Sequence, residues 1–109
     1  MAVKNIAPAA LSSWLNDAAR GRPVLLDVRE SWELETCKLE TAKHIPLRDI
    51  PARFGELDAD AEVVVICHHG GRSMQAALFL ERQGFAGVHN LAGGMDAWAR
   101  QVDPAMPVY

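Results

Sequence analysis

Residues 63–66 restrict the fold more than any other segment, because all four are aliphatic: Val63-Val64-Val65-Ile66. A strand with one face in water alternates apolar and polar residues, whereas a strand covered on both faces is apolar throughout. The run therefore predicts a central strand of a parallel sheet, buried on both sides. Because parallel strands need crossover connections that are usually helices, strands and helices are expected to alternate along the chain.

The rest of the chain shows that alternation, which is typical of the α/β class. A first helical pattern starts near Pro8, repeats through Ala18 and ends before Gly21. A longer helix is predicted from Ser73 to Gln83, with Gly84 at the position where helices commonly end. The other predicted elements are strands over 24–28, 42–45 and 88–91, short helices over 31–35 and 50–54, and a last helix through Met95, Trp98, Ala99 and Val102.

Length and charge limit the kind of protein this is. The 109 residues suffice for a single domain, and 50% hydrophobic and 23% charged residues are ordinary for a globular protein. A net charge of −3 without a basic cluster argues against nucleic acid as a partner. No apolar run approaches the roughly 20 residues of a membrane span, so no membrane partner is expected. With two cysteines and no signal sequence, the cytoplasm is the predicted location.

The loop that follows the apolar strand carries the residues that indicate chemistry. The strand delivers Cys67 to its carboxyl end, the edge at which open parallel sheets bind ligands. Gly70 and Gly71 permit backbone conformations in which successive N–H groups turn inward, toward the start of the next helix. Arg72 adds a permanent positive charge. Such surroundings favour the thiolate, so Cys67 is a candidate nucleophile.

Two other interpretations of this loop stand beside the nucleophile. A cysteine at the end of an apolar strand is commonly a small core residue, although a core strand needs no anion-binding turn after it. His68 and His69 next to Cys67 suggest a metal, but adjacent side chains rarely converge on one ion. We therefore expect no metal and no other cofactor. One histidine is expected to line the pocket and the other to face solvent.

Four segments occur in an order typical of one family. The first is Leu26-Asp27-Val28-Arg29-Glu30 with Trp32-Glu33, and the second is Ile45-Pro46-Leu47. The cysteine loop follows, and the last is Leu91-Ala92-Gly93-Gly94-Met95 with Trp98. Together they resemble the rhodanese family of sulfurtransferases over about residues 5–100. Residues 37–42 depart from the family, which often has Gly-His-Ile-Pro-Gly-Ala there, so the local turn is left open.

The resemblance implies one domain over residues 1–109, with a short C-terminal tail and a central, mostly parallel sheet of about five strands flanked by helices on both faces. It implies that Cys67 takes the outer sulfur of thiosulfate or another persulfide donor. The resulting persulfide passes the sulfur to a thiol or protein acceptor, or to cyanide in vitro. Arg72 would orient the anionic donor. The residues implied to bind substrate are His68, His69, Gly70, Gly71 and Ser73.

Residues outside the loop have more than one interpretation. Asp27 and Arg29 lie at the end of a neighbouring strand and are possible supports for the loop. A structural ion pair of Arg29 with Glu30 or Glu33 is the alternative. Cys37 is either a resolving thiol for the persulfide or a structural cysteine.

Two further functions fit the same fold. Related phosphatases and arsenate reductases resemble this loop but have five residues between cysteine and arginine, and here there are four. A non-catalytic or sulfur-carrier interaction module is the other alternative. The intact Cys67 and Arg72 argue against it, since such modules typically lose the cysteine.

Overall fold

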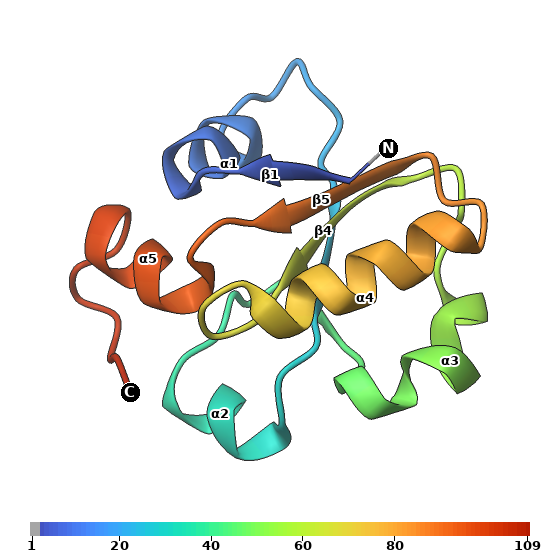
Figure 1. Ribbon diagram of the computed structural model, residues 1–109. Coiled ribbons are helices and arrows are strands. Elements are labelled where there is room, and N and C mark those ends of the chain that lie inside the picture. Colours follow the sequence, from blue (N-terminus) through green and yellow to red (C-terminus); the bar gives the residue numbers. More distant parts are fainter. Residues whose placement is uncertain (1–2) are drawn as a thin grey trace.

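Five parallel strands form one sheet in the order β1-β5-β4-β2-β3 (Figure 1). The computed structural model describes residues 3–109. The all-aliphatic segment is the middle strand, as the sequence predicted. The strands are β1 (Lys4–Ile6), β2 (Val24–Asp27), β3 (Lys43–His44), β4 (Glu62–Ile66) and β5 (Gly87–Leu91).

Helices cover both faces of the sheet, which confirms the predicted α/β class. Alternate residues of β4 enter two separate cores. Val63 and Val65 face the core under α3 and α4, whereas Val64 and Ile66 face the core under α1 and α5. The helices are α1 (Pro8–Leu15), α2 (Ser31–Thr36), α3 (Ile50–Arg53), α4 (Gly71–Arg82) and α5 (Gly94–Gln101), with short 3₁₀ turns at Leu47–Asp49 and Phe54–Glu56.

The end of α4 follows from its sequence. Gly84 has a φ of +95°, a left-handed conformation that glycine adopts without steric cost. Its N–H donates to the carbonyl of Glu81, and the N–H of Phe85 donates to that of Leu80. Phe85 is buried in the core next to Leu80. This is the Schellman arrangement, and it confirms Gly84 as the predicted end of the helix.

In the N-terminal third, one predicted boundary is wrong and one strand was missed. Helix α1 ends at Leu15 rather than continuing past Ala18, which is exposed. The carboxylate of Asp17 accepts a hydrogen bond from the N–H of Ala19, a local turn that competes with helix. Strand β1 was not predicted, because three residues with a single apolar side chain give no periodicity. Between residues 3 and 109, no helix has the length and apolar character needed to span a bilayer.

Candidate active site

Cys67 lies at the carboxyl end of β4, where the chain turns into α4. Its side chain continues the alternation of Val63 and Val65 and is almost completely buried. The N–H of Gly70 donates to Sγ at 3.0 Å, and the hydroxyl of Ser73 lies 3.2 Å from Sγ. Gly70 has a φ of +107°, which turns its N–H back toward the sulfur. The loop therefore places one backbone N–H donor and one hydroxyl group directly against the sulfur.

The turn after β5 holds the loop in place. The N–H groups of Met95 and Asp96, in the first turn of α5, donate to the carbonyls of Cys67 and His68 at 2.8 and 3.1 Å. Gly94 has a φ of +60°, and a Cβ there would overlap both carbonyl oxygens. This contact requires glycine. The turn at Gly93 and Gly94 therefore directly contacts the loop that begins at Cys67.

A chain of polar side chains runs from the sulfur to the edge of the sheet. The hydroxyl of Ser73 donates to Oδ1 of Asn90 at 2.5 Å, and the Asn90 amide donates to Oδ1 of Asn5 at 3.1 Å. Because a hydroxyl has one hydrogen, a Ser73 that donates to Asn90 offers its lone pairs to the Cys67 thiol. Asn90 and Asn5 link β5 and β1 to the site.

Arg72 points to a buried carboxylate. Its two terminal nitrogens donate to the two oxygens of Glu33, both at 2.7 Å. Glu33 is buried at the start of α2 and also accepts from the backbone N–H of Glu30 at 2.8 Å. Hydrogen bonding from Arg72, with a smaller contribution from that N–H, lowers the pKa of Glu33 to about 2. Glu33 thus fixes the guanidinium beside the loop.

The expected effect of Glu33→Gln depends on pH. A lowered carboxyl pKa stabilises the folded state above the ordinary value of 4.5, and this contribution is lost as the pH falls toward about 2. Glu33→Gln should lower the free energy of unfolding by about 2–3 kcal/mol at pH 7. The gap between variant and parent should close between pH 4.5 and 2, measured by urea unfolding.

The exposed Glu56 provides the control, because it binds Arg53 and Lys43 but lies in solvent. Glu56→Gln should change stability much less than Glu33→Gln at every pH. A Glu33→Gln deficit that stays constant down to acid pH would contradict the ionic role of Glu33.

Arg29 pairs with Asp27, not with Glu30 or Glu33. Its Nε and one terminal nitrogen donate to the carboxylate at 2.9 and 2.7 Å, and both side chains are completely buried. The guanidinium also donates to the carbonyl of Cys37 at 2.8 Å and to the hydroxyl of Tyr109 at 2.9 Å. Asp27 and Arg29 therefore reach the loop only through other residues.

The two histidines of the loop differ in environment. His68 is partly buried against Tyr109, with ring centroids 4.0 Å apart, whereas the side chain of His69 is 72% exposed. Burial, then repulsion from His69, lowers the pKa of His68. His68, His69 and Asp96 place one potential ligand atom each within 4.8 Å of one another, so these residues are where a metal could be held. Asp96 is already paired with Arg100 at 3.1 Å.

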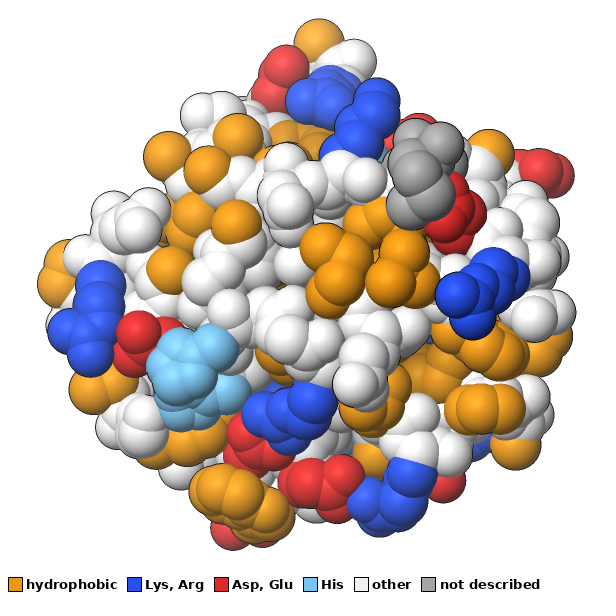
Figure 2. Space-filling model, viewed as in Figure 1, with side chains coloured by type: hydrophobic (Ala, Val, Ile, Leu, Met, Phe, Trp, Pro, Cys, Tyr) orange, Lys and Arg blue, Asp and Glu red, His pale blue; other side chains and the backbone are white. Residues whose placement is uncertain are grey.

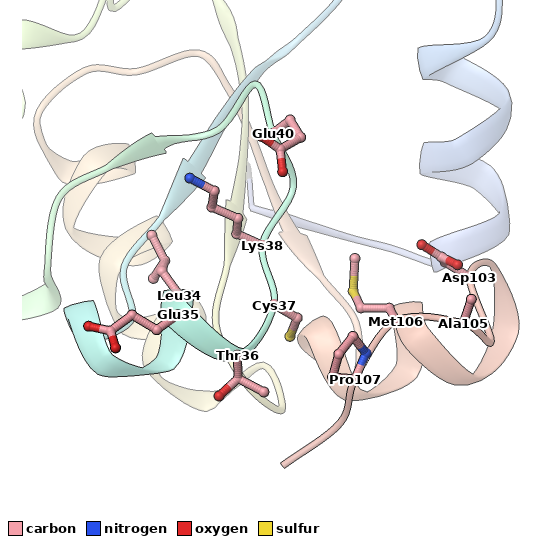
Figure 3. A pocket seen from close by; sticks show the side chains of 10 residues that line it. All are labelled: Leu34, Glu35, Thr36, Cys37, Lys38, Glu40, Asp103, Ala105, Met106 and Pro107. Atoms are coloured by element: carbon pink, nitrogen blue, oxygen red, sulfur yellow. The ribbon is translucent and has the colours of Figure 1, made fainter.

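The surface groove beside Cys37 is separate from the loop. It has a volume of about 380 Å³ and lies between the end of α2 and the segment after α5 (Figure 3). Cys37 is 8% exposed at its base, and the carbonyl of this residue is held by Arg29. None of the residues lining this groove belongs to the Cys67 loop.

The visible surface carries mixed charge. Acidic and basic side chains alternate around a histidine patch, with no continuous patch of either sign on the face shown (Figure 2). This distribution agrees with the small net charge of −3. The fold and the site together define an α/β domain with a candidate cysteine nucleophile in the loop between its middle strand and a helix.

The chain belongs to the family of rhodanese-like domains, which it matches over residues 8–101. The Thiosulfate sulfurtransferase GlpE of Pseudomonas syringae is 36% identical over 75 residues, covering 69% of this chain and 71% of that protein. A protein named Sulfurtransferase from Allochromatium vinosum is 40% identical over 77 residues, covering 71% of this chain and 72% of its own.

Larger relatives and solved structures agree with this assignment. The chain is 38% identical over 112 residues to the Rhodanese-like/PpiC domain-containing protein 12, chloroplastic, of Arabidopsis thaliana. The match covers 98% of this chain but only 38% of that protein. A crystal structure of a rhodanese-like domain protein from Staphylococcus aureus superposes with a TM-score of 0.82 at 26% identity, covering 97% and 98% of the two chains. The predicted fold is confirmed, and the relatives support sulfur transfer in general.

The sequence did not assign several residues that complete the site. Glu33 lay in a family-like motif, but its partner Arg72 is 39 positions away. Asn90 and Asn5 are polar residues in strands, which give no functional signal by themselves. Tyr109 lies outside all four family-like segments.

Proposed function

We propose that this protein transfers sulfane sulfur from thiosulfate or another persulfide donor to a thiophilic acceptor, through a persulfide on Cys67. The observation that carries the proposal is the environment of Sγ, with the Gly70 N–H at 3.0 Å and the Ser73 hydroxyl at 3.2 Å. A persulfide places its negative charge on the outer sulfur, one bond beyond Sγ. The inward-turned loop would stabilise that charge as an oxyanion hole does.

The reaction balances in two displacements. The Cys67 thiolate attacks the outer sulfur of thiosulfate, the S–S bond breaks, and sulfite leaves with the electron pair. The acceptor then attacks the outer sulfur of the Cys67 persulfide and restores the thiolate. Cyanide would become thiocyanate, and a thiolate would become a persulfide, with no external oxidant or reductant.

Arg72 favours an anionic donor. Its guanidinium is fixed by Glu33, yet its side chain remains 37% exposed, so N–H groups that Glu33 does not use can donate to the oxygens of thiosulfate. A loop of four residues between Cys67 and Arg72 favours sulfur transfer over phosphate ester hydrolysis. Because Cys37 and Cys67 are both free thiols, we expect the reaction in a reducing compartment such as the cytoplasm.

The test combines turnover with mass measurement. The protein is treated with thiosulfate, its intact mass is recorded, and thiocyanate formation from cyanide is followed. Parent and Cys37→Ser should each gain one sulfur atom and turn over. Cys67→Ser should do neither.

Three results would count against the proposal. Absence of an added sulfur on the folded parent would overturn transfer from thiosulfate. Retention of the added sulfur in Cys67→Ser would place the persulfide on another residue. Turnover of an aryl phosphate instead would support the phosphatase alternative.

A further inference from the structure

The segment after α5 folds back toward the catalytic loop. The N–H groups of Val102 and Asp103 donate to the carbonyl of Trp98 and end the helix. A turn between Asp103 and Met106 then reverses the chain, and Met106 packs against the core under α1 and α5. Figure 1 shows the segment leaving α5 and ending on the side of the molecule where α2 lies.

The hydroxyl of Tyr109 lies between two charged residues of the site. It donates to Oε1 of Glu33 at 2.9 Å and accepts from a terminal nitrogen of Arg29 at 2.9 Å. Oε1 of Glu33 also accepts a hydrogen bond from one terminal nitrogen of Arg72, and Oε2 accepts from the other. Burial, with donation to Glu33 as a further cause, raises the pKa of Tyr109 to about 12, so the hydroxyl keeps its hydrogen at neutral pH.

The ring of Tyr109 contacts the other side of the loop. It meets the ring of His68 edge to face, with centroids 4.0 Å apart and planes at 82°. Trp32 lies on α2 with its ring centroid 6.0 Å from that of Tyr109. One side chain therefore touches His68, which follows the nucleophile directly, and the carboxylate that holds Arg72.

We propose that Tyr109 is a positioning and specificity-determining residue of the sulfur-transfer site. The hydroxyl holds Glu33 in the orientation that fixes Arg72, and the ring holds His68 and narrows the approach to Cys67. This inference rests on the proposed function. It separates two roles within one side chain: the hydroxyl acts on the affinity for an anionic donor, and the ring acts on the size of the donor that can enter.

Two substitutions separate these roles. Tyr109→Phe keeps the ring and removes the hydroxyl, so KM for thiosulfate should rise about 3- to 10-fold while kcat changes less than 2-fold. The preference of this variant for a small donor over a bulky one should remain as in the parent. Tyr109→Ala removes both, so the ratio of kcat/KM for benzenethiosulfonate to that for thiosulfate should rise about 10-fold or more. Val108→Ala changes a neighbouring exposed residue and should leave all these values unchanged.

A second readout does not require sulfur transfer. The alkylation rate of Cys67 is measured with iodoacetamide and with a bulky N-aryl maleimide, and the modified cysteine is identified by peptide mass spectrometry. Tyr109→Ala should accelerate the bulky reagent at least about 5-fold more than the small one. Tyr109→Phe and Val108→Ala should behave as the parent.

The two readouts distinguish failure of the inference from failure of the proposed function. Unchanged alkylation selectivity in folded Tyr109→Ala would overturn the role of the ring, whatever the turnover. Selective alkylation without any turnover would retain that role and reject thiosulfate as donor. If thermal unfolding shows that Tyr109→Ala is not folded, Tyr109→Phe decides: an unchanged KM for thiosulfate would overturn the role of the hydroxyl.

Discussion

Gly94→Ala is expected to lower kcat/KM for sulfur transfer by about 100-fold or more. The new Cβ would overlap the carbonyl oxygens of Cys67 and His68, and both belong to the backbone, so the loop must move away from α5. A displacement of about 1 Å at a reacting group costs on the order of 100-fold in rate. The φ of +60° adds roughly 1–2 kcal/mol of strain for any residue with a side chain.

The measurement is single-turnover formation of the Cys67 persulfide, followed by intact mass, together with urea unfolding to separate loss of activity from loss of structure. Gly55→Ala is the matched control, because a Cβ at Gly55 would meet nothing within 4 Å. It should retain the parent rate. A folded Gly94→Ala that keeps more than about a third of the parent rate would show that the contact with α5 does not position the loop.

Asp27→Asn is expected to lower the free energy of unfolding by about 3–5 kcal/mol, because it leaves the completely buried guanidinium of Arg29 without a counterion. The other hydrogen-bond partners of the guanidinium are the Tyr109 hydroxyl, the Cys37 sulfur and the backbone carbonyls of Glu33 and Cys37, and none of them is a carboxylate. The value is measured by urea unfolding at neutral pH. The double variant Asp27→Asn with Arg29→Met should recover part of the loss, since it removes the unpaired charge.

The ion pair of Arg53 with Glu56 is the comparison. The two side chains are 38% and 42% exposed, and the residues are three apart on one turn. Arg53→Met should therefore change stability little. If Asp27→Asn lowered the free energy of unfolding as little as Arg53→Met does, the charge of Arg29 would not depend on Asp27 for its stabilisation.

The sequence was sufficient where local chemistry decides the structure. Four successive aliphatic residues are stable only where both faces of the strand are buried. The segment is accordingly β4, the middle strand of the sheet. Gly84 ends α4 because only glycine adopts its positive φ without cost. The position of Cys67 followed from these two elements, since a loop between a central strand and a helix lies at the carboxyl edge of the sheet.

The sequence was insufficient where two local signals compete and where distant residues decide the structure. The helical spacing through Ala18 was correct as a pattern, but Asp17 offers the backbone another hydrogen bond and α1 stops first. The partner of Arg29 was sought in Glu30 and Glu33, whose carboxylates are two competing acceptors nearby. In the folded protein Glu33 forms its ion pair with Arg72, and Arg29 forms its ion pair with Asp27.

The pairing of β1 with β5 also sets the order in which the chain reaches its native structure. Residues 4–6 have no partner strand until residues 87–91 have been synthesised, whereas β2, β3 and β4 can pair earlier. Contacts of such high sequence separation form slowly, because a long loop must close first. Asn5 reaches Asn90 only through this pairing. The hydrogen-bond chain behind Cys67 is therefore expected to form late, after nearly the whole domain has left the ribosome.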